Sequence, residues 1–181
     1  PSAIACSEKV QESWTIPAVE INDTPRLGYR GLMLDVSRYF IPKETVLRII
    51  DNMSVLKMNK LHLHLVDDNG WRLEIKKYPK LTEVGAWRVE RDEPFPAREV
   101  AKPGEKATVG GFYTQEDIRE MVAFAQERHV EIIPEIEMPA HTNSSLAAYP
   151  ELACSVVEKP ITVLPGLNTK QAAIIYCAGK D

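Results

Sequence analysis

The sequence predicts an α/β fold in which parallel strands alternate with helices. Short apolar runs of strand length alternate with longer segments whose apolar residues recur at helical spacing, a pattern typical of βαβ units. Acidic residues and a histidine follow these runs, at the strand ends where α/β proteins collect their ligand chemistry. The 181 residues are 44% hydrophobic and 27% charged, which is ordinary for a globular domain of this length.

Two of the predicted strands are almost wholly apolar. Residues Tyr29–Val36 form one short run with Asp35 near its end, and Val130–Ile136 form another with Pro134 inside it. Continuous apolar runs of this length are typical of strands buried on both faces of a parallel sheet. Pro134 predicts a local bend, or a position whose amide the sheet does not need.

The remaining predicted strand, Leu61–Val66, alternates leucines with His62 and His64. Side chains along a strand point to opposite faces in turn, so the leucines share one face and the two histidines share the other. Two imidazoles on one face can ligate zinc, which makes a metal-dependent amidohydrolase barrel one alternative. An H-x-H pattern alone is a weak signal, so we favour hydrogen-bonded interior histidines and expect no metal.

Two helices are predicted between these strands. Residues 42–60 place their apolar side chains on one face, and Pro42 suits the first helical turn. The second helix begins after Thr114, ends near Arg128, and carries Asp117 three residues after Thr114. That spacing is typical of a capping box, in which the two side chains satisfy each other's backbone amides.

The other segments lack a regular period. Residues 1–26 are interpreted as a lead-in or linker from a preceding domain, residues 71–113 as a long elaborated loop, and Ala173–Cys177 as a possible fourth strand. Three or four parallel strands leave two unprotected sheet edges, and a complete (β/α)8 barrel typically needs ~250 residues. Residues 27–181 are therefore either a small open α/β domain or the amino-terminal portion of a barrel. The poorly periodic tail favours the barrel portion.

Composition and motifs exclude several classes of function. The net charge of −4 argues against nucleic-acid binding, because phosphate contacts need a basic face. No run of about 18 apolar residues is present, so no membrane-spanning helix is expected. The sequence also lacks the glycine motifs of P-loops, dinucleotide-binding folds and nucleophile elbows, and we expect no cofactor.

The three cysteines, Cys6, Cys154 and Cys177, lie far apart and form no C-x-x-C motif. Neither a zinc knuckle nor a thioredoxin-type site is indicated. We interpret them as small buried hydrophobic side chains, and the sequence leaves open whether any two form a disulfide.

The candidate functional residues follow the predicted strands. Asp35 ends the first, Asp67 and Asp68 follow the second, and Glu137 and His141 follow the third. Paired carboxylates at a strand end can position a sugar hydroxyl or hold the orientation of a neighbouring group. A carboxylate beside an imidazole fixes the tautomer of the ring and raises its basicity, so we expect Glu137 to contact His141.

Arg30 precedes the first apolar run, and we interpret it as a buried cation. A buried arginine needs an anion or several acceptors. We expect Asp67 to be that anion, which would leave part of the guanidinium free to hold the vicinal hydroxyls of a sugar.

Two long segments resemble the catalytic barrel of family 20 glycoside hydrolases, the β-N-acetylhexosaminidases. The first is YRGLMLDVSRYFIPKETVLRIIDNMSVLKMNKLHLHLVDDNGWRLEIKKYPKLTEVGAWR, and the second is GGFYTQEDIREMVAFAQERHVEIIPEIEMPAHTNSSLAAYPEL. The resemblance covers roughly Trp14 to Leu152. It implies a (β/α)8 barrel that removes terminal, non-reducing β-linked N-acetylglucosamine or N-acetylgalactosamine from glycans. We also expect a secreted, periplasmic or otherwise exported protein.

The resemblance further implies a substrate-assisted retaining mechanism. The acetamido oxygen of the substrate attacks the anomeric carbon, a glutamic acid protonates the leaving oxygen, and the aspartate before it orients the acetamido group. The Gly-Gly-Asp-Glu motif that carries this pair does not occur in the 181 residues. We therefore assign no catalytic acid here and expect the isolated chain to be inactive; a non-catalytic sugar-binding domain is a second alternative.

Substrate-binding residues are carried over from the resemblance by position. Arg30 matches the arginine that grips the ring hydroxyls, Asp67 the acid at the second strand end, and His141 the histidine after the third. Three further acids are expected to support them: Glu137, Asp68 and Asp35.

Overall fold

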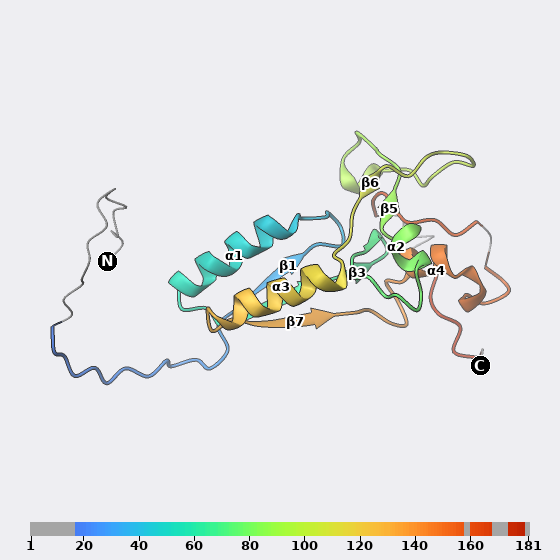
Figure 1. Cartoon of the computed structure of the whole chain (residues 1–181). Helices are drawn as coiled ribbons and strands as arrows, with labels where there is room; N and C mark the ends of the chain where they lie inside the picture. The colour runs from blue at the N-terminus through green and yellow to red at the C-terminus, as the bar shows by residue number, and fades with distance from the viewer. Residues whose placement is uncertain (1–16, 158–159, 168–173, 180–181) are drawn as a thin grey trace.

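The computed structural model describes residues 17–157, 160–167 and 174–179. The elements follow one another in this order: β1 (Gly31–Asp35), α1 (Lys43–Val55), β2 (Lys60–His64), β3 (Val66–Asp67), β4 (Gly70–Trp71), α2 (Lys80–Glu83), β5 (Trp87–Arg88), η1 (Phe95–Ala97), β6 (Val109–Gly110), α3 (Gln115–Gln126), β7 (Glu131–Glu135), α4 (Asn143–Ala148) and η2 (Pro150–Leu152). Figure 1 shows the sheet and its two long helices as one body, with the shorter elements gathered beyond the carboxyl ends of the strands. Within the described residues, every helix is too short or too polar to cross a bilayer.

A three-stranded parallel sheet forms the centre of the fold. Its strand order is β1-β2-β7, and both pairs are parallel, which confirms the predicted strands and their arrangement. The register pairs Asp35 with His64, and His64 with Glu135. Because side chains paired across neighbouring strands point to the same face, these three polar side chains form one row near the carboxyl edge of the sheet.

Both long helices cover the same face of the sheet (Figure 1). Leu61 and Leu63 point toward them and are fully buried. Salt bridges from the Lys43 amine to Asp117 and Glu120 join α1 to α3. The apolar core between helices and sheet includes Val46, Ile50, Met53, Met121 and Ala125.

The predicted capping box starts α3. The Thr114 hydroxyl accepts a hydrogen bond from the Asp117 amide, and the Asp117 carboxylate accepts one from the Thr114 amide. Two amides that no helical carbonyl reaches are satisfied in this way.

The loop prediction for residues 71–113 is wrong in part. This excursion contains α2, the short β5–β6 ladder and a 3-10 turn. Backbone hydrogen bonds join the first residues of the excursion to its last ones. Its elements are only two to four residues long, so they carry too little periodicity to be read from sequence.

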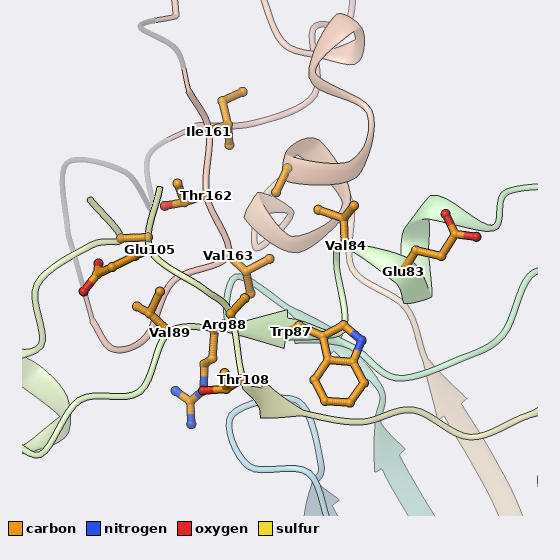
Figure 2. Close-up of a pocket in the computed structure, with 13 residues that line it drawn as sticks. Glu83, Val84, Trp87, Arg88, Val89, Glu105, Thr108, Ile161, Thr162 and Val163 are labelled. Atoms are coloured by element: carbon orange, nitrogen blue, oxygen red, sulfur yellow. The ribbon is translucent and has the colours of Figure 1, made fainter. Parts of the chain in front are cut away.

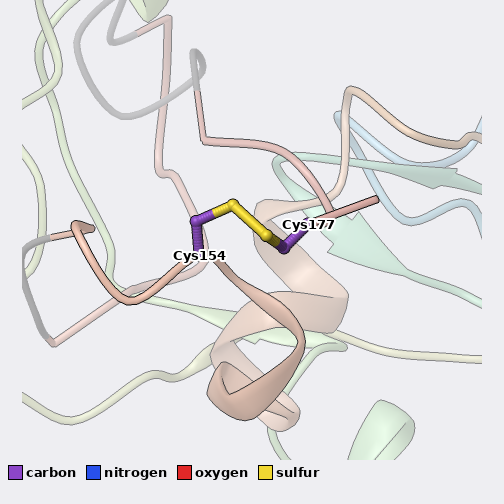
Figure 3. Close-up of a disulfide and its surroundings, with 2 residues drawn as sticks. All are labelled: Cys154 and Cys177. Atoms are coloured by element: carbon purple, nitrogen blue, oxygen red, sulfur yellow. A yellow bond between two sulfur atoms is a disulfide. The ribbon is translucent and has the colours of Figure 1, made fainter. Parts of the chain in front are cut away.

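The tail after β7 also has more order than its sequence indicates. α4 begins at Asn143, and a single β-bridge joins Tyr176 to Ala153; the beginning of the suggested fourth strand lies outside the described residues. Cys154 and Cys177 form a disulfide across 23 residues, so their interpretation as buried thiols is wrong (Figure 3). Cys6 lies outside the described residues.

Candidate active site

A buried carboxylate, Asp67, lies at the centre of the polar cluster beyond the sheet. Its side chain is 2% exposed, and its Oδ2 lies 2.7 Å from an Arg38 nitrogen and 2.9 Å from His64 Nε2. Its Oδ1 accepts a 2.6 Å hydrogen bond from the Asp68 amide. Burial alone would raise the pKa of Asp67, but these donors, above all His64, lower it below its ordinary value. Asp67 is therefore an ionised acceptor that fixes the cations around it.

Arg38 is held between two strand ends. The Asp35 carboxylate accepts from the Arg38 backbone amide at 3.0 Å and from its Nη1 at 2.9 Å, while Asp67 binds Nη2. The Arg38 side chain remains one-third exposed. Two carboxylates thus orient the guanidinium while leaving part of its edge open to a ligand.

His64 is the most strongly perturbed histidine among the described residues. Its Nε2 lies 2.9 Å from Asp67 Oδ2 and its Nδ1 2.8 Å from Glu135 Oε2. Hydrogen bonding to Asp67, with the further acids Glu135 and Asp35, outweighs burial and raises the pKa of His64 to about 9. The two contacts confirm that His64 is hydrogen-bonded within the sheet, and its raised pKa favours the imidazolium at neutral pH. Its neighbour on the same face, His62, also binds Glu135, at 2.6 Å.

His141 approaches the acidic pair from the loop after β7. Its Nδ1 lies 3.4 Å from Asp67 Oδ1 and 3.6 Å from Asp68 Oδ2, and its side chain is half exposed. The Asn143 amide donates to Asp68 Oδ1 at 3.2 Å, which ties the start of α4 to the same pair. Burial raises the pKa of Asp68. Because Nδ1 faces the carboxylates, Nε2 is the ring nitrogen left for a substrate or another catalytic group.

The predicted contact between Glu137 and His141 is wrong. The Glu137 carboxyl hydrogen-bonds Glu135 instead, and this bond raises the pKa of Glu137. Burial would raise the pKa of Glu135, but the hydrogen bond from His64 helps to lower it. The loop bend at residues 138–141 gives His141 a φ of +54° and directs its ring to the end of β3 rather than back along β7.

The predicted pairing of Arg30 with Asp67 is also wrong. Arg30 precedes β1, so it lies at the amino end of the sheet, a strand length of about 13 Å from the carboxyl end. Its side chain is partly exposed and donates to the carbonyls of Lys57 at 2.6 Å and Leu27 at 2.7 Å. The structure brings Arg38 to Asp67 in its place.

Two residues of this cluster were not singled out from the sequence, Arg38 and Glu135. A signal existed for Arg38, because it follows Asp35 by three residues and so lies at the same carboxyl end as the other candidates. Glu135 could be found only through the strand register, which pairs it with His64.

A third residue, Arg72, was also missed, and it holds the site loops together. It is 1% exposed, and its guanidinium donates to carbonyls of four segments rather than to any carboxylate among the described residues. The acceptors are the carbonyls of Val36, Ser37, Asn69, Ala86 and Gly111, at 2.6 to 3.4 Å. One buried cation thus clamps the end of β1, the β3–β4 turn and both arms of the excursion. Burial lowers its pKa to about 10, so it stays charged.

The metal alternative fits these groups poorly. His64 lies with Glu135 and Glu137, and Asp67 with Asp68 and His141, in clusters small enough for one ion. A metal-binding imidazole must offer a lone pair, and both nitrogens of His64 are occupied by carboxylates that keep it protonated. Asp67 is likewise already neutralised by Arg38 and His64.

A cavity of about 680 Å³ lies between the excursion and the tail, and none of its lining residues belongs to this cluster. Figure 2 shows Trp87 and Val163 on its wall, with the side chain of Arg88 pointing away from Val163. The Trp87 indole is held by a 3.0 Å hydrogen bond to the Thr82 carbonyl.

The sequence is similar to those of curated β-hexosaminidases. A β-hexosaminidase of Porphyromonas gingivalis is 44% identical over 181 residues, which is 100% of this chain and 21% of that protein. A β-hexosaminidase of Vibrio furnissii is 46% identical over 139 residues, covering 75% of this chain and 22% of the relative. The chain thus spans about a fifth of the length of these curated relatives.

Solved structures give the same result. The family 20 β-N-acetylhexosaminidase of Streptomyces coelicolor matches with a TM-score of 0.70 and 42% identity, covering 88% of this chain and 28% of that one. The model of the glycosyl hydrolase family 20 catalytic domain matches residues 27–180. The carboxyl end of the parallel sheet carries a cluster of acidic, arginine and histidine side chains. The family match and the similarity to these relatives show that the chain belongs to glycosyl hydrolase family 20.

Proposed function

We propose that the protein containing this chain hydrolyses terminal, non-reducing β-linked N-acetylhexosamine residues of glycans by a substrate-assisted retaining mechanism. The observation that carries the proposal is the buried, ionised Asp67, which fixes Arg38 and faces the half-exposed His141. Membership of family 20 supports the reaction class. The metal-dependent and purely sugar-binding alternatives have no comparable support.

The residue roles follow from this geometry. Arg38, oriented by Asp35 and Asp67, presents its open edge to two neighbouring hydroxyls of the terminal sugar. His141 offers its Nε2 to the substrate or to the group that protonates the leaving oxygen. We assign the sugar-gripping role to Arg38 rather than to Arg30, which lies at the other end of the sheet and donates to the carbonyls of Lys57 and Leu27.

We place the general acid, and the aspartate that orients the acetamido group, in a part of the protein outside these 181 residues. The chain contains no Gly-Asp-Glu sequence, and its relatives are several times longer. The isolated chain is accordingly expected to give background rates with an aryl N-acetyl-β-glucosaminide, because losing general-acid catalysis alone costs ~10²–10⁴-fold. Clear turnover by the purified chain would refute this placement.

The same proposal makes β1, β2 and β7 the first three strands of a (β/α)8 barrel, with residues 1–26 as a lead-in from a preceding domain. One-sided helix cover and a polar row on the opposite face support the barrel. The start of the family match at residue 27 supports the boundary. No strand among the described residues pairs with the outer edge of β1. Amide exchange at this edge should be slower in the longer protein than in this chain; equal rates would contradict the barrel.

We also propose that the protein is exported. The Cys154–Cys177 disulfide supports this, because such bonds persist in oxidising compartments. Mass spectrometry of the protein from its native cell, with free thiols alkylated before reduction, should find both cysteines unmodified by the alkylating reagent.

The glycosidase proposal is tested by a matched pair of variants in the longer protein. Arg38→Lys keeps the charge but loses the planar fork, so kcat/KM should fall by the equivalent of about 2–5 kcal/mol. Arg30→Lys changes the same residue type at the other end of the sheet and should leave kcat/KM nearly unchanged. Equal losses in both variants would contradict the assignment. A β-glucoside, which lacks the acetamido group, should not be turned over; comparable turnover would contradict substrate assistance.

A further inference from the structure

Two arginines outside the cluster described above converge on a single backbone carbonyl. Arg88 in β5 and Arg98 after η1 both donate through Nη1 to the carbonyl of Pro165, Arg98 at 3.3 Å. Their guanidinium carbons lie 5.1 and 5.8 Å from the centre of the Tyr39 ring. Two positive charges therefore share one small volume over one aromatic ring.

No carboxylate of the described residues lies within salt-bridge distance of either cation. In the same loop, Arg91 has such a partner, Glu105, at 2.7 Å. Arg88 is 3% exposed, and its Nε has no acceptor among the described residues. Burial lowers the pKa of Arg88, and the charge of Arg98 lowers it further. A buried cation without a counter-charge is costly, and a like charge beside it adds to the cost.

Arg72 shows how this chain satisfies a buried arginine when no anion is involved. Its guanidinium finds five carbonyls. The guanidinium of Arg88 has one carbonyl, which it shares with Arg98, and a hydrogen bond with the Tyr39 side chain, while its Nε has no acceptor among the described residues. Arg98, unlike Arg88, is only partly buried. Unlike the Arg72 clamp, this pair keeps a buried donor without an acceptor and two positive charges without a carboxylate among the described residues.

We propose that Arg88 and Arg98 form a binding site for an oxyanion, a sulfate, phosphate or carboxylate group, over the ring of Tyr39. Tyr39 is half exposed, and the Phe95 ring lies 6.2 Å from it, so the two rings offer an apolar wall to whatever carries the anion. Guanidinium groups bind such oxyanions through paired N–H donors.

The proposed site adjoins the candidate active site through the backbone. Tyr39 directly follows Arg38, and the Leu164 amide, one residue before Pro165, donates to the Asp68 carbonyl at 2.9 Å. An anionic substituent on a glycan and a free oxyanion share the chemistry that the two arginines recognise, and binding measurements separate them.

The first measurement is isothermal titration of the 181-residue chain with sodium sulfate, against sodium chloride at equal ionic strength. We expect saturable sulfate binding that Arg98→Gln weakens about tenfold, the effect of losing a charge-assisted hydrogen bond. Arg119→Gln removes the same charge from an exposed helix position and should bind as the unmodified chain does. Arg98→Lys should fall between the two, and circular dichroism checks that each variant is folded.

Absence of sulfate binding by the unmodified chain would overturn the proposal, as would equal binding by Arg98→Gln. The carrier is then identified by titrating N-acetylglucosamine with and without a sulfate ester. If the chain prefers the sulfated sugar and Arg98→Gln abolishes that preference, the anion is carried by the glycan. If free sulfate binds as tightly as the sulfated sugar, the anion is a separate ligand. Either result supports the site. Arg38→Lys should weaken binding of the sugar and leave binding of free sulfate unchanged. The sulfate titration therefore tests the anion site even if the glycosidase proposal fails.

Discussion

The charge of His64 should make the stability of the fold depend on pH in the mildly alkaline range. His64 is buried, lies between Asp67 and Glu135 with Asp35 nearby, and has Arg38 as its opposing cation at 3.1 Å. The acids prevail and raise its pKa from 6.5 to about 9. Between pH 6.5 and about pH 9, the folded chain therefore keeps a proton on His64 that the unfolded chain has released.

The magnitude follows from proton linkage. A raised pKa in the folded state means that its contribution to stability is complete below pH 6.5 and is lost as the pH rises through about 9. Each pH unit between these values corresponds to about 1.4 kcal/mol, so the total is about 3 kcal/mol. The His64 side chain is 7% exposed, and solvent screens this interaction little.

Urea denaturation followed by tryptophan fluorescence measures this dependence. The free energy of unfolding should fall by about 3 kcal/mol between about pH 6 and about pH 9.5. His64→Gln keeps a hydrogen-bonding side chain without the titration, so its free energy of unfolding should change far less over the same range. Equal stability of the unmodified chain at both ends of the range would refute the reasoning, as would the same slope in His64→Gln.

Three further changes test the packing around the site. Arg72→Lys should lower the free energy of unfolding by about 2–5 kcal/mol, because an amine cannot reach all the carbonyls that the guanidinium joins. The control Arg119→Gln, at an exposed ion pair, should change the free energy of unfolding by less than about 1 kcal/mol. Equal effects of the two substitutions would show that the clamp is unimportant. Reducing the Cys154–Cys177 bond should cost about 3 kcal/mol, given the 23 residues between its ends, which thermal melting with and without reductant measures; an unchanged melting temperature would contradict this. Thr114→Ala removes the helix cap and should cost about 1 kcal/mol in urea denaturation, whereas Thr114→Ser should cost little.

The regular parts of the fold were predictable because their signals are local. The apolar run at Tyr29–Val36 predicts β1, the helical period of residues 42–60 predicts α1, and the Thr114–Asp117 spacing predicts the start of α3. The excursion at residues 71–113 was not predictable in detail, because its short elements are fixed by contacts with Arg72 rather than by their own periodicity.

The candidate site was predictable only as far as strand ends can be located. Placing Asp67 and His141 at the same edge needs only a parallel sheet, and the structure brings them together. Choosing between Arg30 and Arg38 requires knowing at which end of β1 each lies. An apolar neighbourhood in the sequence does not specify burial, and the Arg30 side chain is partly exposed. Glu135 depends on the strand register, which no single segment specifies.

The spacing of the three paired strands along the chain has a kinetic consequence. β1 and β2 meet across 29 residues that include α1, whereas β2 and β7 meet across 71. Closing the longer loop costs about 0.8 kcal/mol more in chain entropy, so we expect the β1–α1–β2 unit to form before β7 docks onto it. Arg72 joins Ala86 and Gly111 within that longer loop and so shortens the chain that docking must close. We therefore expect loss of the clamp in Arg72→Lys to slow refolding as well as to weaken the native fold, which stopped-flow refolding measures; an unchanged refolding rate would contradict this role.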